Sequence, residues 1–182
     1  SEVSAHEQIE LGYAYEEYLK NTKSKNSKIK TLIYRHVPKD LYSFYECVGV
    51  QYDGDTIDTK TINNIISEGN KIIISGTGGI GKTTMLKHFY LNTIEDTSYI
   101  PVLVELRMVN SMEVDNISMY AIVFDNLVNN GFRMEDKYYR YSLEEGGYVI
   151  LLDGFDEINR EKIPKLTEEI ISFSGKYPQN KY

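Results

Sequence analysis

Residues 71–84 read KIIISGTGGIGKTT, and this stretch decides the fold of the 182-residue chain. Its first five residues are rich in β-branched side chains without polar alternation, which is typical of a strand buried on both faces. Residues 76–83 fit G-x-x-x-x-G-K-[ST] at every fixed position. A helix is predicted over about 81–94, so the glycine-rich segment lies between a strand and a helix, the setting that this pattern requires.

The glycine-rich segment has the composition of a loop that wraps a phosphate group. Such a loop turns tightly and aims its N–H groups inward, which glycines permit because they lack a Cβ atom. The helix that begins near Gly81 points the positive end of its dipole at the anion. Lys82 places a cation on the β- and γ-phosphates, the Thr83 hydroxyl can bind Mg²⁺, and Thr84 is expected to back the α-phosphate. The residues predicted to bind the nucleotide are Gly76, Thr77, Gly78, Gly79, Ile80, Gly81, Lys82, Thr83 and Thr84.

A second candidate site follows the apolar run at residues 148–152, which predicts another buried strand. This strand leads into Asp153. Because ligands of open α/β sheets bind at the carboxyl ends of the strands, Asp153 is expected to face the same crevice as Lys82. Asp153 would hold Mg²⁺ through water, so Thr83 and Asp153 are the predicted metal residues.

The residues after Asp153 leave two interpretations open. Many ATPases with a phosphate loop have Glu directly after the strand-end Asp, where it can orient the attacking water. Here that position is Gly154, and the acids are Asp156 and Glu157. They are either a first-turn helix pair that complements the dipole, or displaced catalytic or water-positioning acids, with Asp156 favoured. The predicted catalytic residues are Lys82, Asp153, Asp156 and Glu157.

The remaining pattern predicts an α/β fold with a parallel sheet and flanking helices, preceded by a small leader of helices and strands. Ser4 and Glu7 have the spacing of a capping box at the start of the first helix. The leader is assigned to residues 1–69, with helices at about 5–21 and 58–68, a polar linker at 20–30, strands at 30–36 and 46–52, and a turn or short helix at 38–45. The nucleotide-binding part is assigned to residues 70–182, with further strands at 100–107 and 148–152 and helices at 116–130, 134–145 and 163–174.

Composition narrows the function classes. The net charge is −7, and the excess of acids lies wholly in residues 51–182, so nothing in the balance favours nucleic-acid binding. No apolar run exceeds six residues, against about 20 for a membrane-spanning helix. With the single cysteine Cys47 and no visible signal peptide, a cytoplasmic protein is expected. The chain starts with Ser1 rather than Met, which favours a fragment of a longer protein.

Three segments together resemble the NACHT class of STAND NTPases. They are GTGGIGKTT at residues 76–84, PVLVELR at 101–107 and YVILLDGFDEI at 148–158, where a small residue and an acidic pair follow the strand-end Asp. The resemblance implies an NTPase that binds ATP or GTP with Mg²⁺, hydrolyses it slowly and uses it as a switch for self-oligomerisation through the full-length protein. It also implies a role in signal transduction, in innate or antiphage defence.

The resemblance implies a specific order of strands as well. In this class the strand after the second motif lies between the two motif strands, and the sequence ends at Tyr182, about where that strand begins. The domain is therefore expected to be incomplete in this chain and poorly stable on its own, with exposed strand edges.

Two other function classes stay open at this point. One is a different enzyme with a phosphate loop, such as a kinase or an ATPase motor; residues 107–147 show no substrate-binding pattern typical of a kinase. The other is a module that binds a nucleotide without hydrolysing it. These residues do not distinguish an adenine nucleotide from a guanine nucleotide.

Overall fold

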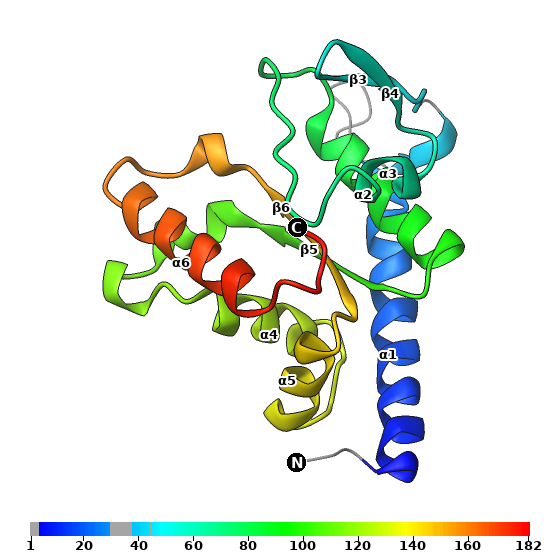
Figure 1. Ribbon diagram of the computed structural model, residues 1–182, viewed down its shortest axis with the longest axis vertical. Helices are drawn as coiled ribbons and strands as arrows, with labels where there is room; N and C mark the ends of the chain where they lie inside the picture. The colour runs from blue at the N-terminus through cyan, green and yellow to red at the C-terminus, as the bar shows by residue number, and fades with distance from the viewer. Residues whose placement is uncertain (1–3, 30–37, 44) are drawn as a thin grey trace.

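The computed structural model describes residues 4–29, 38–43 and 45–182 (Figure 1). Up to residue 70 they form α1 (Ala5–Asn26), β1 (Lys28–Ile29), β2 (Lys39–Asp40), the 3₁₀ helix η1 (Leu41–Ser43), β3 (Gly49–Tyr52), β4 (Asp55–Asp58) and α2 (Ile62–Ile66). Beyond it they form α3 (Lys82–Asp96), β5 (Ile100–Glu105), η2 (Leu106–Ser111), η3 (Val114–Asn116), α4 (Met119–Asn129), α5 (Asp136–Glu144), β6 (Tyr148–Asp153), η4 (Phe155–Glu157) and α6 (Ile163–Lys176).

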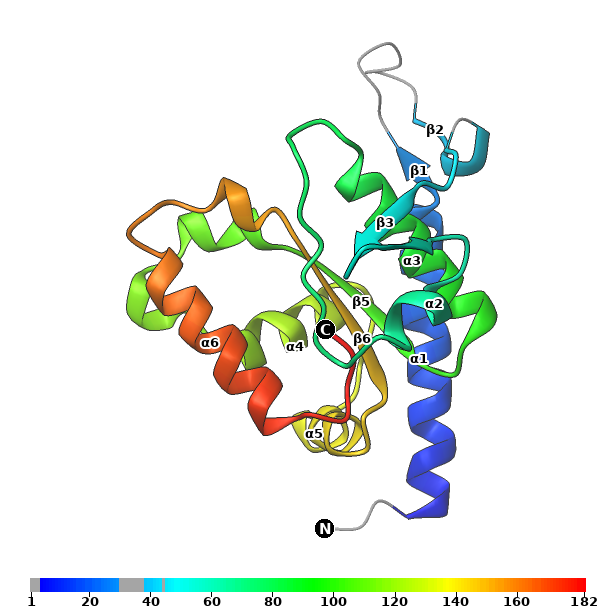
Figure 2. The same cartoon turned by 45° about the horizontal axis from the view of Figure 1, so that its top comes forward.

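The centre of the fold is the parallel pair β5 and β6, in register from Ile100↔Tyr148 to Glu105↔Asp153. In Figures 1 and 2 the strands lie side by side, with α4 and α6 on one side and α3 on the other. Alternate residues of β6 serve the two faces: Ile150 packs in the core that α4 and α6 cover, and Val149 packs against α3. The predicted α/β class with a parallel sheet and flanking helices is thus confirmed at this level.

The chain after α6 lies next to β6 and continues the parallel arrangement. Lys181 donates its N–H to Tyr148 O (3.0 Å), and Ile150 donates to Lys181 O (2.8 Å). On the other side Tyr182 donates to Asn70 O and Ile72 donates to Tyr182 O, both at 2.8 Å. Residues 181–182 therefore lie between β6 and residues 70–72, where the strand after the second motif was expected.

The predicted strand at residues 71–75 is wrong in its burial and in its pairing. Residues 71–75 form no strand, and the Ile73 side chain is 96% exposed. Ile72 is the residue of this segment that bonds to Tyr182. A β-branched sequence favours extended backbone, yet a strand also needs a partner for its N–H and C=O groups along its length.

The first helix is longer than the sequence predicted, and it includes most of the polar segment taken for a linker. The capping box of Ser4 and Glu7 is present as predicted. The helix then continues to Asn26 because Thr22 and Asn26 are buried, and the Tyr90 hydroxyl of α3 donates to Thr22 Oγ1. Tertiary packing here overrides the weak helix propensity of Ser, Thr and Asn.

The rest of the leader differs from the prediction mainly in its boundaries. The expected strand at 46–52 is β3, and it pairs with β4 in a hairpin whose turn is Asp53–Gly54. Because residues 55–58 are a strand, the helix expected at 58–68 shortens to α2, which Thr61 caps. The 3₁₀ helix η1 lies within the turn or short helix expected at 38–45. The strand expected at 30–36 lies outside the described residues.

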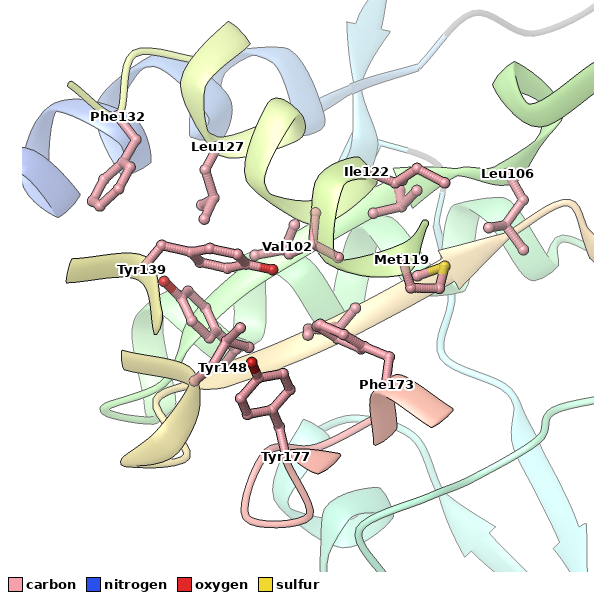
Figure 3. Close-up of a cluster of buried hydrophobic side chains, with 14 of the residues drawn as sticks. Val102, Leu106, Met119, Ile122, Leu127, Phe132, Tyr139, Tyr148, Phe173 and Tyr177 are labelled. Carbon is pink, nitrogen blue, oxygen red and sulfur yellow. The ribbon is translucent and has the colours of Figure 1, made fainter. Parts of the chain in front are cut away.

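Aromatic and aliphatic side chains from α1, α4, α5 and α6 form the larger core (Figure 3). Tyr139 of α5 and Tyr148 of β6 are fully buried, with ring centroids 6.0 Å apart. Tyr15 of α1 reaches the same place, where its hydroxyl bonds to Ser142 Oγ at 2.8 Å and to the Tyr148 hydroxyl. The leader helix thus shares a core with residues after 70, and the predicted boundary at residue 70 stays a prediction.

Among the described residues, side chains and not a further strand cover the outer edge of β5. The Tyr18 hydroxyl of α1 donates to Pro101 O at 3.0 Å, and Asn126 Nδ2 of α4 donates to Leu103 O at 3.0 Å. Ile100 bonds toward β6, so its neighbour Pro101 faces outward, where a missing N–H breaks no ladder bond.

Candidate functional site

The glycine-rich loop joins residues 72–75 to the first turn of α3. Gly79 (φ 78°) and Gly81 (φ 96°) have positive φ angles, which side chains with a Cβ atom rarely adopt. Ile80 donates its N–H to Thr77 O at 3.4 Å and closes the turn between them. Residues 76–81 are all exposed, so the loop presents its backbone to solvent.

Lys82 is the first residue of α3, and its side chain folds back over the loop. Its Nζ donates to Gly76 O (2.7 Å) and Thr77 O (3.4 Å). The same ammonium lies 3.9 Å from Asp156 Oδ2. Since Asp156 is 68% exposed, this ion pair contributes little to stability. The ion pair matters because it shows that Asp156, from the segment after β6, lies next to Lys82 of the glycine-rich motif.

The N-terminus of α3 is open to an anion. Gly81 is the N-cap residue and supplies no side-chain hydrogen bond, while its carbonyl accepts the first intrahelical bond from Met85. The N–H groups of Lys82, Thr83 and Thr84 therefore point out of the helix without a side-chain cap. Such a terminus combines free donors with the positive end of the helix dipole.

Asp153 ends β6 on the face that α3 covers. Val149 and Leu151 pack in the core beneath α3, and Asp153 is the next residue of that alternation. Gly154 follows with φ 81° and turns the chain away from the strand. Asp153 and the α3 terminus with Thr83 thus belong to the same face of the sheet.

Two charged residues near Asp153 were absent from the sequence prediction. Glu105 ends β5 directly beside Asp153 in register, so both carboxylates point to the α3 face. Burial lowers the pKa of Lys87 on α3, while the charges of Glu105 and Asp153 raise it. The signal for Glu105 was available, because it ends a predicted buried strand just as Asp153 does. Lys87 belongs to no recognised pattern.

Asp156 and Glu157 lie on η4, a three-residue 3₁₀ turn, and both are exposed. They lie in the first turn of η4 and outside α6, which begins at Ile163, and both interpretations of the pair stay predictions. Gly154, in the left-handed conformation, changes the direction of the chain between β6 and η4. Of the two acids, Asp156 lies near Lys82, whereas Glu157 is tied through its backbone carbonyl to Asn110.

The residues present fit a magnesium ion that takes some of its ligands from the protein and others from a phosphate. In the described part of the chain, no group of three or more His, Cys, Asp and Glu side chains could hold a metal. A hydroxyl and a carboxylate are available instead, from Thr83 and Asp153. Mg²⁺ in nucleotide sites commonly takes one or two protein oxygens and fills its octahedron with phosphate oxygens and water.

No known protein family matches this chain, and neither the curated proteins nor the solved structures include a significant match. None of the helices among residues 4–29, 38–43 and 45–182 combines the length and the apolar composition of a membrane span.

Proposed function

We propose that this chain binds a nucleoside triphosphate, ATP or GTP, through residues 76–84. The observation that carries the proposal is the position of Lys82. Its ammonium bonds to carbonyls of the glycine loop, directly before an uncapped helix N-terminus. A phosphate held there would receive loop and helix N–H groups together with the Lys82 cation. The proposal thus assigns to residues 76–84 the phosphate-binding role that the sequence pattern predicts.

Thr83 and Asp153 would hold the Mg²⁺ of the bound nucleotide. When bound, the ion would neutralise the charge that develops on the phosphate oxygens. Asp153 is suited to this role because it ends a buried strand on the α3 face, and Thr83 is the second residue of α3. Lys82 would hold the phosphates.

Hydrolysis, where it occurs, is proposed to be slow. No carboxylate follows Asp153 directly, because residue 154 is glycine. The nearest candidate is Asp156, on an exposed turn and 3.9 Å from Lys82 Nζ. Asp156 would orient the attacking water, with Glu157 the second choice. We expect Asp156→Asn to lower the hydrolysis rate and to spare nucleotide binding; equal loss of both would contradict this role.

The wider proposal is a nucleotide-dependent switch of the NACHT type. It rests on the resemblance of residues 76–84, 101–107 and 148–158, and on the place of residues 181–182 between the two motif segments. In this proposal, nucleotide state controls self-oligomerisation of the full-length protein in cytoplasmic defence signalling.

The decisive experiment is titration calorimetry of the full-length protein with Mg-ATP and Mg-GTP, before and after Lys82→Ala. We expect binding of at least one nucleotide and its loss in the variant. Lys71→Ala, an exposed lysine next to the same loop, is the matched control and should bind normally. Unchanged affinity in Lys82→Ala would contradict the proposal.

Turnover measurements separate the switch from its alternatives. Slow hydrolysis that rises with a trigger supports the switch. Fast constant hydrolysis or phosphate transfer to a second substrate would indicate a motor or a kinase. Tight binding without turnover would indicate a module that keeps the nucleotide as a structural ligand.

A further inference from the structure

The turn that carries the acids is bound to the loop after β5 through one side chain. Asn110, in η2, donates its Nδ2–H to Glu157 O at 2.9 Å. Its Oδ1 accepts the N–H of Asn159 at 2.8 Å. One amide group thus bonds to the backbone at two points, at the end of η4 and just after it. These two bonds fix both the Asn110 side chain and the path of the chain behind Asp156.

The segment around Asn110 is organised in turn by a buried lysine. Lys162 lies just before α6 and is 7% exposed. Its Nζ donates to the carbonyls of Val109 (3.1 Å), Asn110 (2.6 Å) and Met112 (2.5 Å). An ammonium has three N–H donors, and here each has a backbone acceptor.

A buried ammonium is costly unless hydrogen bonds replace its water shell. Within the described residues Lys162 takes part in no ion pair, so the three carbonyls carry that replacement. The backbone of residues 109–112 must therefore keep the curved path that aims these carbonyls at Lys162. That path also presents Asn110 to η4. We call Asn110 and Lys162 together the latch.

Asp156 depends on this backbone for its position. Its side chain makes no hydrogen bond within the part of the chain that the structure describes, and its one ion pair there is with Lys82 at 3.9 Å. Where Asp156 lies relative to the glycine loop is therefore decided by the path of η4. The latch holds the far end of that turn, while Gly154 and β6 hold its beginning.

We infer that Asn110 and Lys162 are positioning residues for hydrolysis: they hold η4 so that Asp156 stays beside Lys82 and the phosphates. The inference rests on the proposed nucleotide-binding function and deepens it. The latch touches none of the residues predicted to bind the nucleotide, and among the predicted catalytic residues it contacts the backbone carbonyl of Glu157. It should therefore affect the chemical step and leave nucleotide affinity unchanged.

The first test compares Asn110→Ala and Lys162→Met with the unsubstituted full-length protein. We expect kcat for nucleotide hydrolysis to fall by up to about 10²-fold, the loss that a displacement of about 1 Å can cause. The Kd for the nucleotide should stay within about twofold, since positioning of the acid makes no ground-state contact. Matched controls are the exposed Asn129→Ala and Lys176→Met, which should change neither quantity.

The second test asks whether the latch acts through Asp156. Asn110→Ala is repeated in the Asp156→Asn background, as a double-mutant cycle on kcat. If the latch works by placing Asp156, the second substitution should cost almost nothing further, because residues that act as a unit are not additive. The same fold loss in both backgrounds would overturn the inference and leave the latch a purely structural feature.

Two further readouts keep the outcomes distinct. Hydrogen exchange of the amides in residues 154–159 should quicken in Asn110→Ala even without nucleotide. If Lys162→Met fails to fold, Asn110→Ala carries the test alone. Turnover in the unsubstituted protein with unchanged kcat in Asn110→Ala would overturn this inference only. Absence of nucleotide binding in the unsubstituted protein would overturn the proposed function and this role with it.

Discussion

Two apolar segments of this chain have similar composition but differ in strand pairing and in burial. Residues 71–75 and residues 148–152 are both rich in aliphatic side chains, and both predict a buried strand. Residues 148–152 lie in β6, which pairs with β5 on one side and with Lys181 on the other. In residues 71–75 the backbone bonds to Tyr182 at Ile72, and Ile73 is 96% exposed.

The difference teaches that side-chain pattern and strand formation are separate requirements. Apolar side chains favour the burial of a segment, but the backbone groups of a buried segment also need hydrogen-bond partners, which neighbouring strands supply to β6. β6 has both kinds of support, from Ile150 and Val149 on its two faces and from a neighbour at each edge. The following predictions test this comparison, from the largest expected effect to the smallest.

The largest expected effect comes from matched truncations in the two segments. Ile150→Ala should lower the free energy of unfolding by about 2–5 kcal/mol, because Ile150 is 1% exposed and a cavity would remain. Ile73→Ala should change it by less than about 0.5 kcal/mol, as for an exposed site. Urea unfolding measures both values, and equal costs would contradict the contrast in burial.

The next effect concerns the residue that anchors the chain beside β6. Asn180 is fully buried; its Oδ1 accepts the N–H of Tyr148 (3.0 Å) and its Nδ2 donates to Leu143 O (2.8 Å). Asn180→Ala leaves these groups unpaired and should cost about 1–3 kcal/mol of unfolding free energy.

The same substitution should weaken the neighbouring pairing of residues 181–182. Hydrogen exchange at the Ile72 amide, which donates to Tyr182 O, is expected to quicken. The exposed neighbour provides the control variant Gln179→Ala, which should affect exchange little. Unaltered protection of Ile72 in Asn180→Ala would show that Asn180 does not hold this part of the chain in place.

The smallest effect belongs to an exposed tie between α1 and α5. The backbone N–H of Ser4 is the main cause that lowers the pKa of Glu7 from 4.5 to about 2, and hydrogen bonds from Tyr138 and Lys137 add to it. The ionised form is therefore favoured by folding. Its contribution to stability is present above about pH 4.5 and is lost as the pH falls toward 2.

Glu7→Gln should remove this pH dependence. The stability difference between the unsubstituted protein and the variant should be constant above pH 4.5 and should shrink between pH 4.5 and 2. Thermal unfolding at a series of pH values measures it, with the exposed Glu144→Gln on α5 as control. A difference that does not change with pH would contradict the lowered pKa of Glu7.

Local patterns with a physical cause were the predictable part of this fold. The capping box at Ser4, the helix after the glycine loop and the two parallel strands all follow from residues close together in sequence. The length of α1 was not predictable in this way. It depends on Tyr90, 68 residues away, whose hydroxyl meets Thr22. That residues 71–75 form no strand likewise depends on neighbours that no local pattern contains.

The candidate site divides in the same manner. The loop glycines, Lys82 and Asp153 belong to sequence patterns with fixed spacing, and the structure brings Lys82 and Asp156 to within 3.9 Å. Glu105 was within reach of sequence reasoning, because parallel strands end at the same edge. The roles of Asn110 and Lys162 could not be predicted from the sequence. They depend on the backbone carbonyls that these side chains contact in the folded chain.

The covered edge of β5 has a consequence for how copies of this protein can meet. An open strand edge templates the addition of a strand from another molecule, which is a common route to aggregation. On β5, Tyr18 and Asn126 already occupy outward carbonyls, and Pro101 offers no N–H to an incoming chain. α1 and α4 therefore leave this edge of β5 with fewer backbone groups to which a strand of another molecule could bond.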